Sequence, residues 1–146
     1  SMSILVAVDL SPASEKVVEA AGRLAKLTDA AVYVLHTAEP EPDFVGYDAG
    51  PEVVRTQIAQ ELRREHRDVQ ALAEKLRSDG IDATALLVRG PTVETTLKEA
   101  ESLKAELIVV GSHGHGAVYD VLVGSYSAGI IRRSKLPVLV VPIRDS

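Results

Sequence analysis

Cysteine and tryptophan are absent from this chain of 146 residues, which contains only one phenylalanine and four tyrosines. Without cysteine there can be no disulfide framework, no thiolate metal site and no cysteine nucleophile. The few aromatic rings leave no obvious set of platforms on which nucleic-acid bases could stack. These absences favour a cytoplasmic protein whose ligand is not a nucleic acid.

The charge balance and the length of the apolar runs exclude further classes of protein. The formal net charge is −5, so the chain lacks the excess of lysine and arginine that neutralises nucleic-acid phosphates. The longest apolar stretches, such as residues 136–143, are far shorter than the roughly 20 residues that span a bilayer. The first residues lack the basic segment followed by an apolar segment that is typical of a secretory signal. We therefore expect one soluble, cytoplasmic domain over residues 1–146 that binds neither nucleic acid nor membrane.

Short runs rich in branched apolar residues alternate with amphipathic segments along the chain. The runs are typical of strands buried on both faces and cover residues 3–8, 31–36, 82–88, 105–110 and 136–141. The helical segments cover residues 12–27, 52–78, 93–103 and 125–133, and residues 38–51 form the longest predicted loop. This alternation predicts an α/β fold, with a doubly wound parallel sheet of five strands in the order 3-2-1-4-5 and helices on both faces. Ligands of such sheets bind beyond the carboxyl ends of strands one and four, where the winding reverses.

Capping signals mark several of the predicted helix boundaries. Ser11 and Pro12 offer an N-cap and a proline at the first helical position, and Thr92 is placed to cap the third helix. Gly80 stands where the residue after a helix end commonly adopts a left-handed conformation. These signals set where the first three helices begin or end.

A glycine-rich segment follows the fourth predicted strand, at one of the two strand ends where a ligand is expected. Its residues are Gly111-Ser112-His113-Gly114, and Gly124-Ser125 then begins the last predicted helix. Glycines let a backbone turn sharply and approach a ligand, while a helix start offers N–H groups and a positive dipole end to an anion. The pattern predicts a phosphate cradle, and the alternative is that the glycines only shape a turn.

These segments resemble the universal stress protein family, and in particular its ATP-binding branch. The sequence matches that branch's pattern G-x-x-G-x9-G-[ST] from Gly111 to Ser125, and residues 136–141 resemble the family's last strand. Residues 6–11 resemble its first strand with the aspartate that follows, and residues 34–37 resemble its second. The likeness covers almost the whole chain and implies a cytoplasmic, adenine-nucleotide-binding protein that acts as a regulatory or sensing module.

The resemblance implies ligand contacts at named positions of this sequence. Asp9 would lie at the ribose or the base, and Thr37 would form a wall beside the adenine. The ribose and the phosphates would be lined by Gly111, Ser112, His113, Gly114, Gly124, Ser125 and Tyr126. ATP or another adenine nucleotide is the implied cofactor, with Mg²⁺ or Mn²⁺ held through phosphate oxygens. From the residues alone, Asp9 could instead cap the first helix or stay in solvent.

Two positions depart from the family pattern. Leu10 stands where a glycine often follows the strand-one aspartate, so its side chain either narrows the pocket or packs against the first helix. The turn after strand three is Gly90-Pro91-Thr92, whereas the family often has one residue between the glycine and the proline. The family pattern therefore gives little basis for a ligand contact from that turn.

Signatures of efficient nucleotide hydrolysis are missing. Residues 117–118 include no lysine, so the glycines do not form a P-loop, and no recognisable base-and-cation arrangement accompanies them. His113 and His115 lack the third protein ligand of a zinc site, and His36 and His66 are expected to be structural or exposed. We therefore expect a binding module with no catalytic residues and no protein-held metal. The alternatives are a nucleotide-independent interaction protein and a slow ATPase or phosphotransfer protein.

The last predicted strand, Val138–Val141, would lie at the edge of the sheet with an unpaired apolar backbone. Pairing with a second copy would cover that edge, although a helix could cover it in a monomer. The family resemblance also implies a homodimer built through this strand. An unknown protein partner would then respond to the nucleotide.

Overall fold

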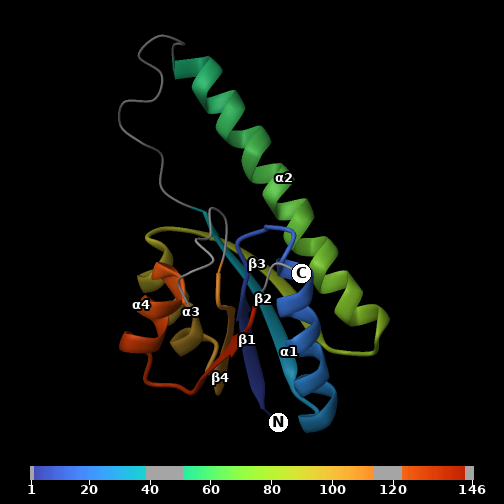
Figure 1. Ribbon diagram of the computed structural model, residues 1–146. Helices are drawn as coiled ribbons and strands as arrows, with labels where there is room; N and C mark the ends of the chain where they lie inside the picture. The colour runs from blue at the N-terminus through green and yellow to red at the C-terminus, as the bar shows by residue number, and fades with distance from the viewer. Residues whose placement is uncertain (1, 39–50, 114–122, 144–146) are drawn as a thin grey trace.

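The sheet forms where the sequence places its branched apolar runs. The computed structural model describes residues 2–38, 51–113 and 123–143. The strands are β1 (Ser3–Ala7), β2 (Ala31–Ala38), β3 (Ala83–Arg89), β4 (Leu107–Gly111) and β5 (Val138–Val141). All neighbouring strands run parallel in the order β3-β2-β1-β4-β5, which confirms the predicted α/β fold and strand order (Figure 1).

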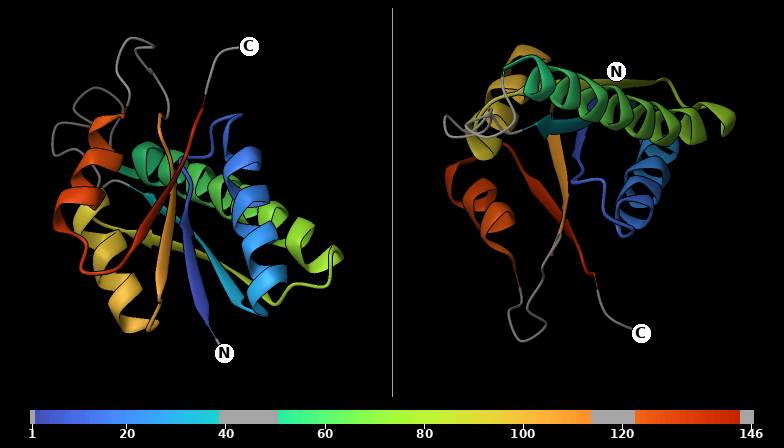
Figure 2. Two further views of the ribbon diagram at one scale, coloured as in Figure 1. Left: turned by 60° about the horizontal axis from the view of Figure 1, so that its bottom comes forward. Right: turned by 90° about the horizontal axis from the view of Figure 1, so that it is seen from above.

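Helices cover both faces of the sheet, as predicted, and the described part of the chain has two on each face. One face carries α1 (Ser14–Thr28) and α2 (Pro51–Ser78), and the other carries α3 (Thr92–Ser102) and α4 (Ser125–Arg133) (Figure 2). Because side chains alternate along a strand, Val6 joins the core beneath α1 and α2, whereas Leu5 joins the core beneath α3 and α4. Burial on both faces explains why β1 and β4, in the middle of the sheet, are almost wholly apolar.

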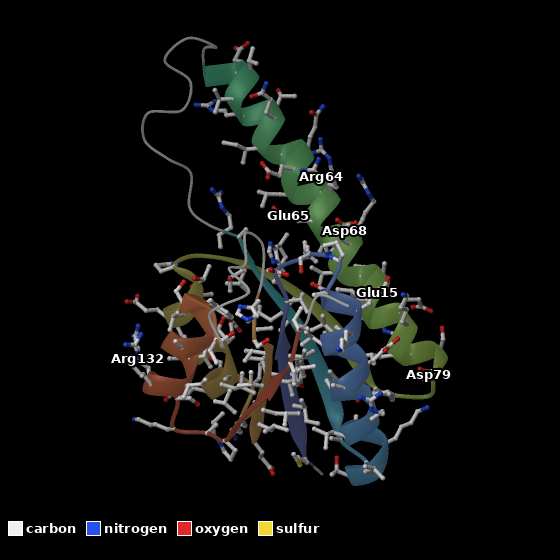
Figure 3. The ribbon with its side chains drawn as sticks, viewed as in Figure 1. Glu15, Arg64, Glu65, Asp68, Asp79 and Arg132 are labelled. Atoms are coloured by element: carbon white, nitrogen blue, oxygen red, sulfur yellow. The ribbon has the colours of Figure 1, made fainter. Side chains whose placement is uncertain are left out.

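The long helix α2 reaches beyond the body of the sheet. Its N-terminal half extends past the carboxyl ends of the strands, at the edge where a ligand is expected (Figure 1). Its second half packs on β2 and β3 and contributes the buried side chains Val69 and Leu72. Lys75 and Glu15 form an ion pair of 2.7 Å that joins α2 to α1. Arg132 of α4 lies across the sheet from the charged residues labelled on these two helices (Figure 3).

The structure corrects the predicted start of the first helix. The prediction placed an N-cap at Ser11 and the first helical residue at Pro12, but both lie in a turn and α1 begins at Ser14. Asp9 is the reason, because its carboxylate accepts the N–H of Ser11 and the hydroxyl of Ser14. Such an Asx turn holds the chain out of the helix for several residues.

Among the other boundaries that differ from the prediction, two have a clear local cause. Thr92, expected to cap the third helix, is the first residue of α3, and Pro91 takes the capping position with an extended backbone. The last strand begins at Val138 rather than at residue 136. Pro137 has no N–H to donate to the strand ladder, so regular pairing starts after it.

Some predictions fall outside the described residues. The predicted long loop lies largely within residues 39–50, and the middle of the glycine-rich segment lies within residues 114–122. Within the three stretches of chain that the structure describes, no helix has the length and apolar character needed to cross a bilayer.

Candidate functional site

β1 and β4 lie side by side in the sheet, and the predicted ligand residues follow their carboxyl ends. The register pairs Val6 with Val109, so Asp9 and Ser112 leave their strands at the same level. β2 flanks β1 on the other side, and Thr37 is the half-buried residue before its last position. The structure therefore brings Asp9 and Ser112 together at the point where the winding reverses, with Thr37 on the neighbouring strand.

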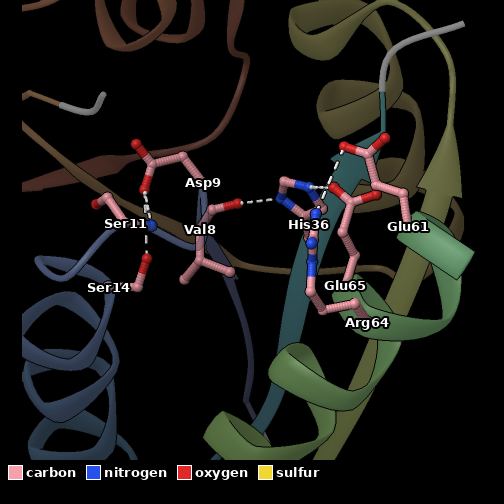
Figure 4. Close-up of polar contacts among 8 residues, drawn as sticks. All are labelled: Val8, Asp9, Ser11, Ser14, His36, Glu61, Arg64 and Glu65. Carbon is pink, nitrogen blue, oxygen red and sulfur yellow. Dashed lines mark hydrogen bonds and ion pairs between the residues drawn. The ribbon is translucent and has the colours of Figure 1, made fainter. Parts of the chain in front are cut away.

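Asp9 organises the turn that leaves β1. Its Oδ1 accepts the backbone N–H of Ser11 at 2.9 Å and the hydroxyl of Ser14 at 3.3 Å (Figure 4). Asp9 does not cap α1, whose N-cap position is Ala13 with no side-chain hydrogen bond, so its contacts shape the turn that precedes the helix. The same contacts hold the carboxylate in a fixed orientation at the strand end, which suits a carboxylate that accepts ligand hydroxyls.

The residues after Asp9 have two uncommon features. Leu10 has a φ of 63°, a left-handed conformation that residues with a Cβ rarely adopt. Its side chain packs against the core beneath α1 and α2, which favours packing over a narrowed pocket. The Ser11 hydroxyl is buried and has no hydrogen-bond partner in the part of the chain that the structure describes. A buried hydroxyl without a partner is costly, so this position suits a ligand atom that supplies one.

Hydrogen bonds tie the exit of β4 to the start of α4. The N–H of Gly124 donates to the carbonyl of Ser112 at 2.6 Å, and the hydroxyl of Ser127 donates to the carbonyl of Gly111. Ser112 is buried, and its hydroxyl accepts the N–H of Ile143 at 2.8 Å, just beyond β5. The Ser112 side chain therefore holds the end of β4 in place through a partly buried hydrogen bond. The Gly124 contact brings the two ends of the glycine motif together.

The first turn of α4 presents N–H groups at the same edge of the sheet. Ala128 donates a hydrogen bond of 2.9 Å to the carbonyl of Gly124, which is the N-cap residue. The N–H groups of Ser125 and Tyr126 come before this first intrahelical bond. Ser125 is exposed, and the positive end of the helix dipole lies at the same point. This geometry suits an anion.

Gly111 and Gly124 differ in the space around them. A Cβ at Gly111 would lie 3.1 Å from Cγ2 of Val17 and 3.3 Å from Cγ1 of Ile143, which is tighter than ordinary contact. Among the described residues, the nearest atom to a Cβ at Gly124 would be the carbonyl oxygen of Ser112 at 3.4 Å, and the φ of −69° suits any residue. Packing therefore explains why residue 111 is a glycine but does not explain the glycine at position 124. A glycine without a packing reason is expected where a ligand approaches the backbone, which favours such an approach at Gly124.

The hydroxyl of Tyr126 points into the protein. It lies 2.6 Å from Oγ1 of Thr96 on α3. Burial raises the pKa of Tyr126 from 10.0 to about 12, and the negative charge of Asp9 adds to this shift. The phenol is therefore neutral at physiological pH, and its contact with Thr96 holds the start of α4 against α3.

The structure says less about two of the predicted residues. His113 follows Ser112 at the β4 exit and is half-buried. Gly114 lies outside the described residues, as does His115. The ligand contacts predicted for His113 and Gly114 stay predictions.

A largely buried contact that the sequence did not reveal lies beside Asp9 and Thr37. His36 of β2 uses both ring nitrogens: Nδ1 lies 2.9 Å from the carbonyl oxygen of Val8, and Nε2 lies 2.8 Å from Oε2 of Glu65 on α2 (Figure 4). Because a carbonyl only accepts, Nδ1 carries a proton and donates it. The contact joins α2 to the ends of β1 and β2 and confirms a structural role for His36. A histidine at the end of a buried strand was the only signal in the sequence, and it identifies neither partner.

Known proteins resemble this chain over nearly its whole length. The model of the universal stress protein family matches residues 2–142. A universal stress protein of Thermus aquaticus is 33% identical over 140 residues, which cover 95% of this chain and 97% of that protein. The solved structure of MJ0577, a protein of Methanocaldococcus jannaschii, has a TM-score of 0.81 at 25% identity and covers 99% of this chain and 98% of that one. A crystal structure of a universal stress protein in complex with cAMP has a TM-score of 0.69 at 25% identity, with coverage of 96% and 95%.

The likeness extends to the elements that build the site. The matched region runs from the residue before β1 to the residue after β5, so the strand ends and the glycine motif fall within it. Both solved structures align over almost their full length, in agreement with the strand order found here. The chain therefore belongs to the universal stress protein family.

Proposed function

We propose that this protein is a single domain that binds ATP or another adenine nucleotide and acts as a regulatory or sensing module. The observation that carries the proposal is the start of α4, where Gly124 has room for a Cβ and lies beside N–H groups that precede the helical ladder. Asp9 and Thr37 occupy neighbouring strand ends at the same edge. A relative of 25% identity has been solved in complex with cAMP, which supports an adenine nucleotide as the ligand.

Different residues of the site would contact the phosphates, the ribose and the adenine. The N–H groups of Ser125 and Tyr126 would face the phosphates, and Asp9 would accept hydrogen bonds from ribose hydroxyls. The buried Ser11 hydroxyl would gain a partner from the ligand, and Thr37 would border the adenine. Phosphate oxygens and water would hold any Mg²⁺ or Mn²⁺.

Calorimetric titration with ATP, AMP and cAMP tests this function. Gly124→Val adds a branched side chain where the phosphates would lie, and we expect it to weaken ATP binding by at least about tenfold, with Gly124→Ala intermediate. Because a Cβ at Gly124 would meet no atom of the described residues closer than 3.4 Å, thermal unfolding of Gly124→Ala should stay near that of the wild type. Equal ATP affinities for the wild type and Gly124→Val would contradict a phosphate site at α4.

Two outcomes would support the other functions considered. A wild-type protein that binds none of the three nucleotides favours a nucleotide-independent interaction protein. Steady release of phosphate from bound ATP, abolished together with binding in Gly124→Val, favours a slow ATPase.

We propose that the protein forms a homodimer through β5. β5 pairs with β4 on one side, and no described strand pairs with its other side. Leu139 of β5 is 38% exposed, and Ile131 of the adjacent helix α4 is 45% exposed. An apolar edge strand of this kind is a template for pairing with a second copy.

Leu139→Lys should convert this dimer to a monomer, because it places a charge on the pairing edge. Leu27→Lys is the control, since Leu27 is 83% exposed near the C-terminal end of α1. Sedimentation equilibrium at micromolar concentration should give twice the mass of 15.6 kDa for the wild type and for Leu27→Lys, and 15.6 kDa for Leu139→Lys. A monomeric wild type overturns the homodimer.

A further inference from the structure

Thr96 is a fully buried residue of α3 that none of the proposed nucleotide contacts includes. Its Oγ1 donates to the carbonyl of Thr92, one turn earlier, at 2.8 Å. A hydroxyl has a single proton, so the 2.6 Å contact with the Tyr126 hydroxyl uses Thr96 as the acceptor. Tyr126 is therefore the donor, and the direction of this hydrogen bond is fixed.

The contact joins two helices at the point where α4 begins. Tyr126 is the second residue of α4 and follows Ser125, whose N–H opens the helix. One turn later, Gly129 lies against α3, because a Cβ there would be only 2.9 Å from Cγ2 of Val93. The hydroxyl contact and the glycine contact lie on successive turns, so together they fix α4 on α3.

We propose that Thr96 is a positioning residue for nucleotide binding, which holds the first turn of α4 through the Tyr126 hydroxyl and so aims its N–H groups at the phosphates. The inference rests on the proposed nucleotide function. Gly124 and Ser127 already bind this turn to the exit of β4, and Thr96 restrains it from the side of α3. Because burial raises the pKa of Tyr126 to about 12, the phenol keeps its proton and remains a donor at physiological pH.

Calorimetry with ATP on four variants tests this role. Thr96→Val removes the hydroxyl at nearly constant volume, and we expect it to weaken ATP binding about fivefold, the equivalent of one hydrogen bond. Thr96→Ser keeps the hydroxyl and should bind ATP within about twofold of the wild type. Tyr126→Phe should match Thr96→Val, and combining the two changes should weaken binding no further, because both remove the same contact.

Val69→Ala separates positioning from a general loss of stability. Val69 is fully buried on α2, in the core on the other face of the sheet, so this variant loses stability without touching α3 or α4. Its ATP affinity should equal that of the wild type at a temperature where every variant is folded. Wild-type affinity in Thr96→Val, or equal weakness in Thr96→Ser, overturns the positioning role alone. A wild type that binds no adenine nucleotide overturns this inference together with the proposed function.

Discussion

Replacing Gly90 with alanine should lower the free energy of unfolding by about 3 kcal/mol. Gly90 follows β3 with a φ of 152°, a conformation that residues with a Cβ rarely adopt. A Cβ there would overlap with Oγ1 of Thr95, which is buried in the first turn of α3. Backbone strain and steric overlap each cost roughly 1–3 kcal/mol, and both act at this position. The corresponding fall in Tm is roughly 10 °C for a domain of this size.

Gly80→Ala is the matched control, because it isolates the backbone strain. Gly80 follows α2 in the predicted left-handed conformation, with a φ of 84°, and a Cβ there would meet no atom within 4 Å. We expect this variant to lose about 1 kcal/mol. Adding Thr95→Ala to Gly90→Ala should recover part of the larger loss, since it removes the overlapping oxygen. Urea unfolding measures each variant, and equal losses at Gly90 and Gly80 would show that the overlap with Thr95 does not matter.

The alternation of strands and helices was sufficient to predict the order of the sheet. Buried parallel strands joined by right-handed helical crossovers leave few arrangements, and the order β3-β2-β1-β4-β5 is among the commonest. The same reasoning placed Asp9 and Gly111 at neighbouring strand ends, because the carboxyl ends of parallel strands meet at one edge. Local turn geometry was harder to predict. The left-handed φ of 63° at Leu10 belongs to the turn after β1, and leucine has no preference for that conformation.

Contacts between distant elements could not be predicted from the sequence. Gly111 and Gly124 are equivalent members of a motif, yet only the atoms around them show that packing requires the first and leaves space at the second. Thr96 and Tyr126 are 30 positions apart. Nothing about a threonine on an amphipathic helix indicates that its hydroxyl will accept a hydrogen bond from a tyrosine of another helix. Such pairs depend on how α3 and α4 pack, which follows from the whole fold rather than from either segment.

Replacing Glu65 with alanine should lower the free energy of unfolding by about 2 kcal/mol, because it removes one partner of a largely buried hydrogen bond. The side chains of His36 and Glu65 are 11% and 21% exposed, and Nε2 lies 2.8 Å from Oε2. The two ring nitrogens of His36 thus contact Val8 and Glu65 together. Without the carboxylate, the ring is left either as a cation with no counter-charge or as a neutral group with an unpaired Nε2.

Two variants on the same helix define what the carboxylate contributes. Glu61 is 62% exposed and lies 3.9 Å from Arg64, so Glu61→Ala should change the free energy of unfolding by less than about 0.5 kcal/mol. Glu65→Gln should cost about 1 kcal/mol, because an amide can still donate to a neutral Nε2 or accept from a protonated one. Urea unfolding distinguishes the three variants.

The position of the contact between Glu65 and His36 also predicts which segment opens more often when the contact is lost. Glu65 joins the projecting half of α2 to His36 of β2, so Glu65→Ala should increase hydrogen exchange in residues 52–64. Exchange in α4 should not change, since it packs on the other face of the sheet. Equal urea midpoints for Glu65→Ala and Glu61→Ala would mean that the contact between Glu65 and His36 does not hold α2, and that apolar packing, including that of Val69 and Leu72, keeps the helix on the sheet.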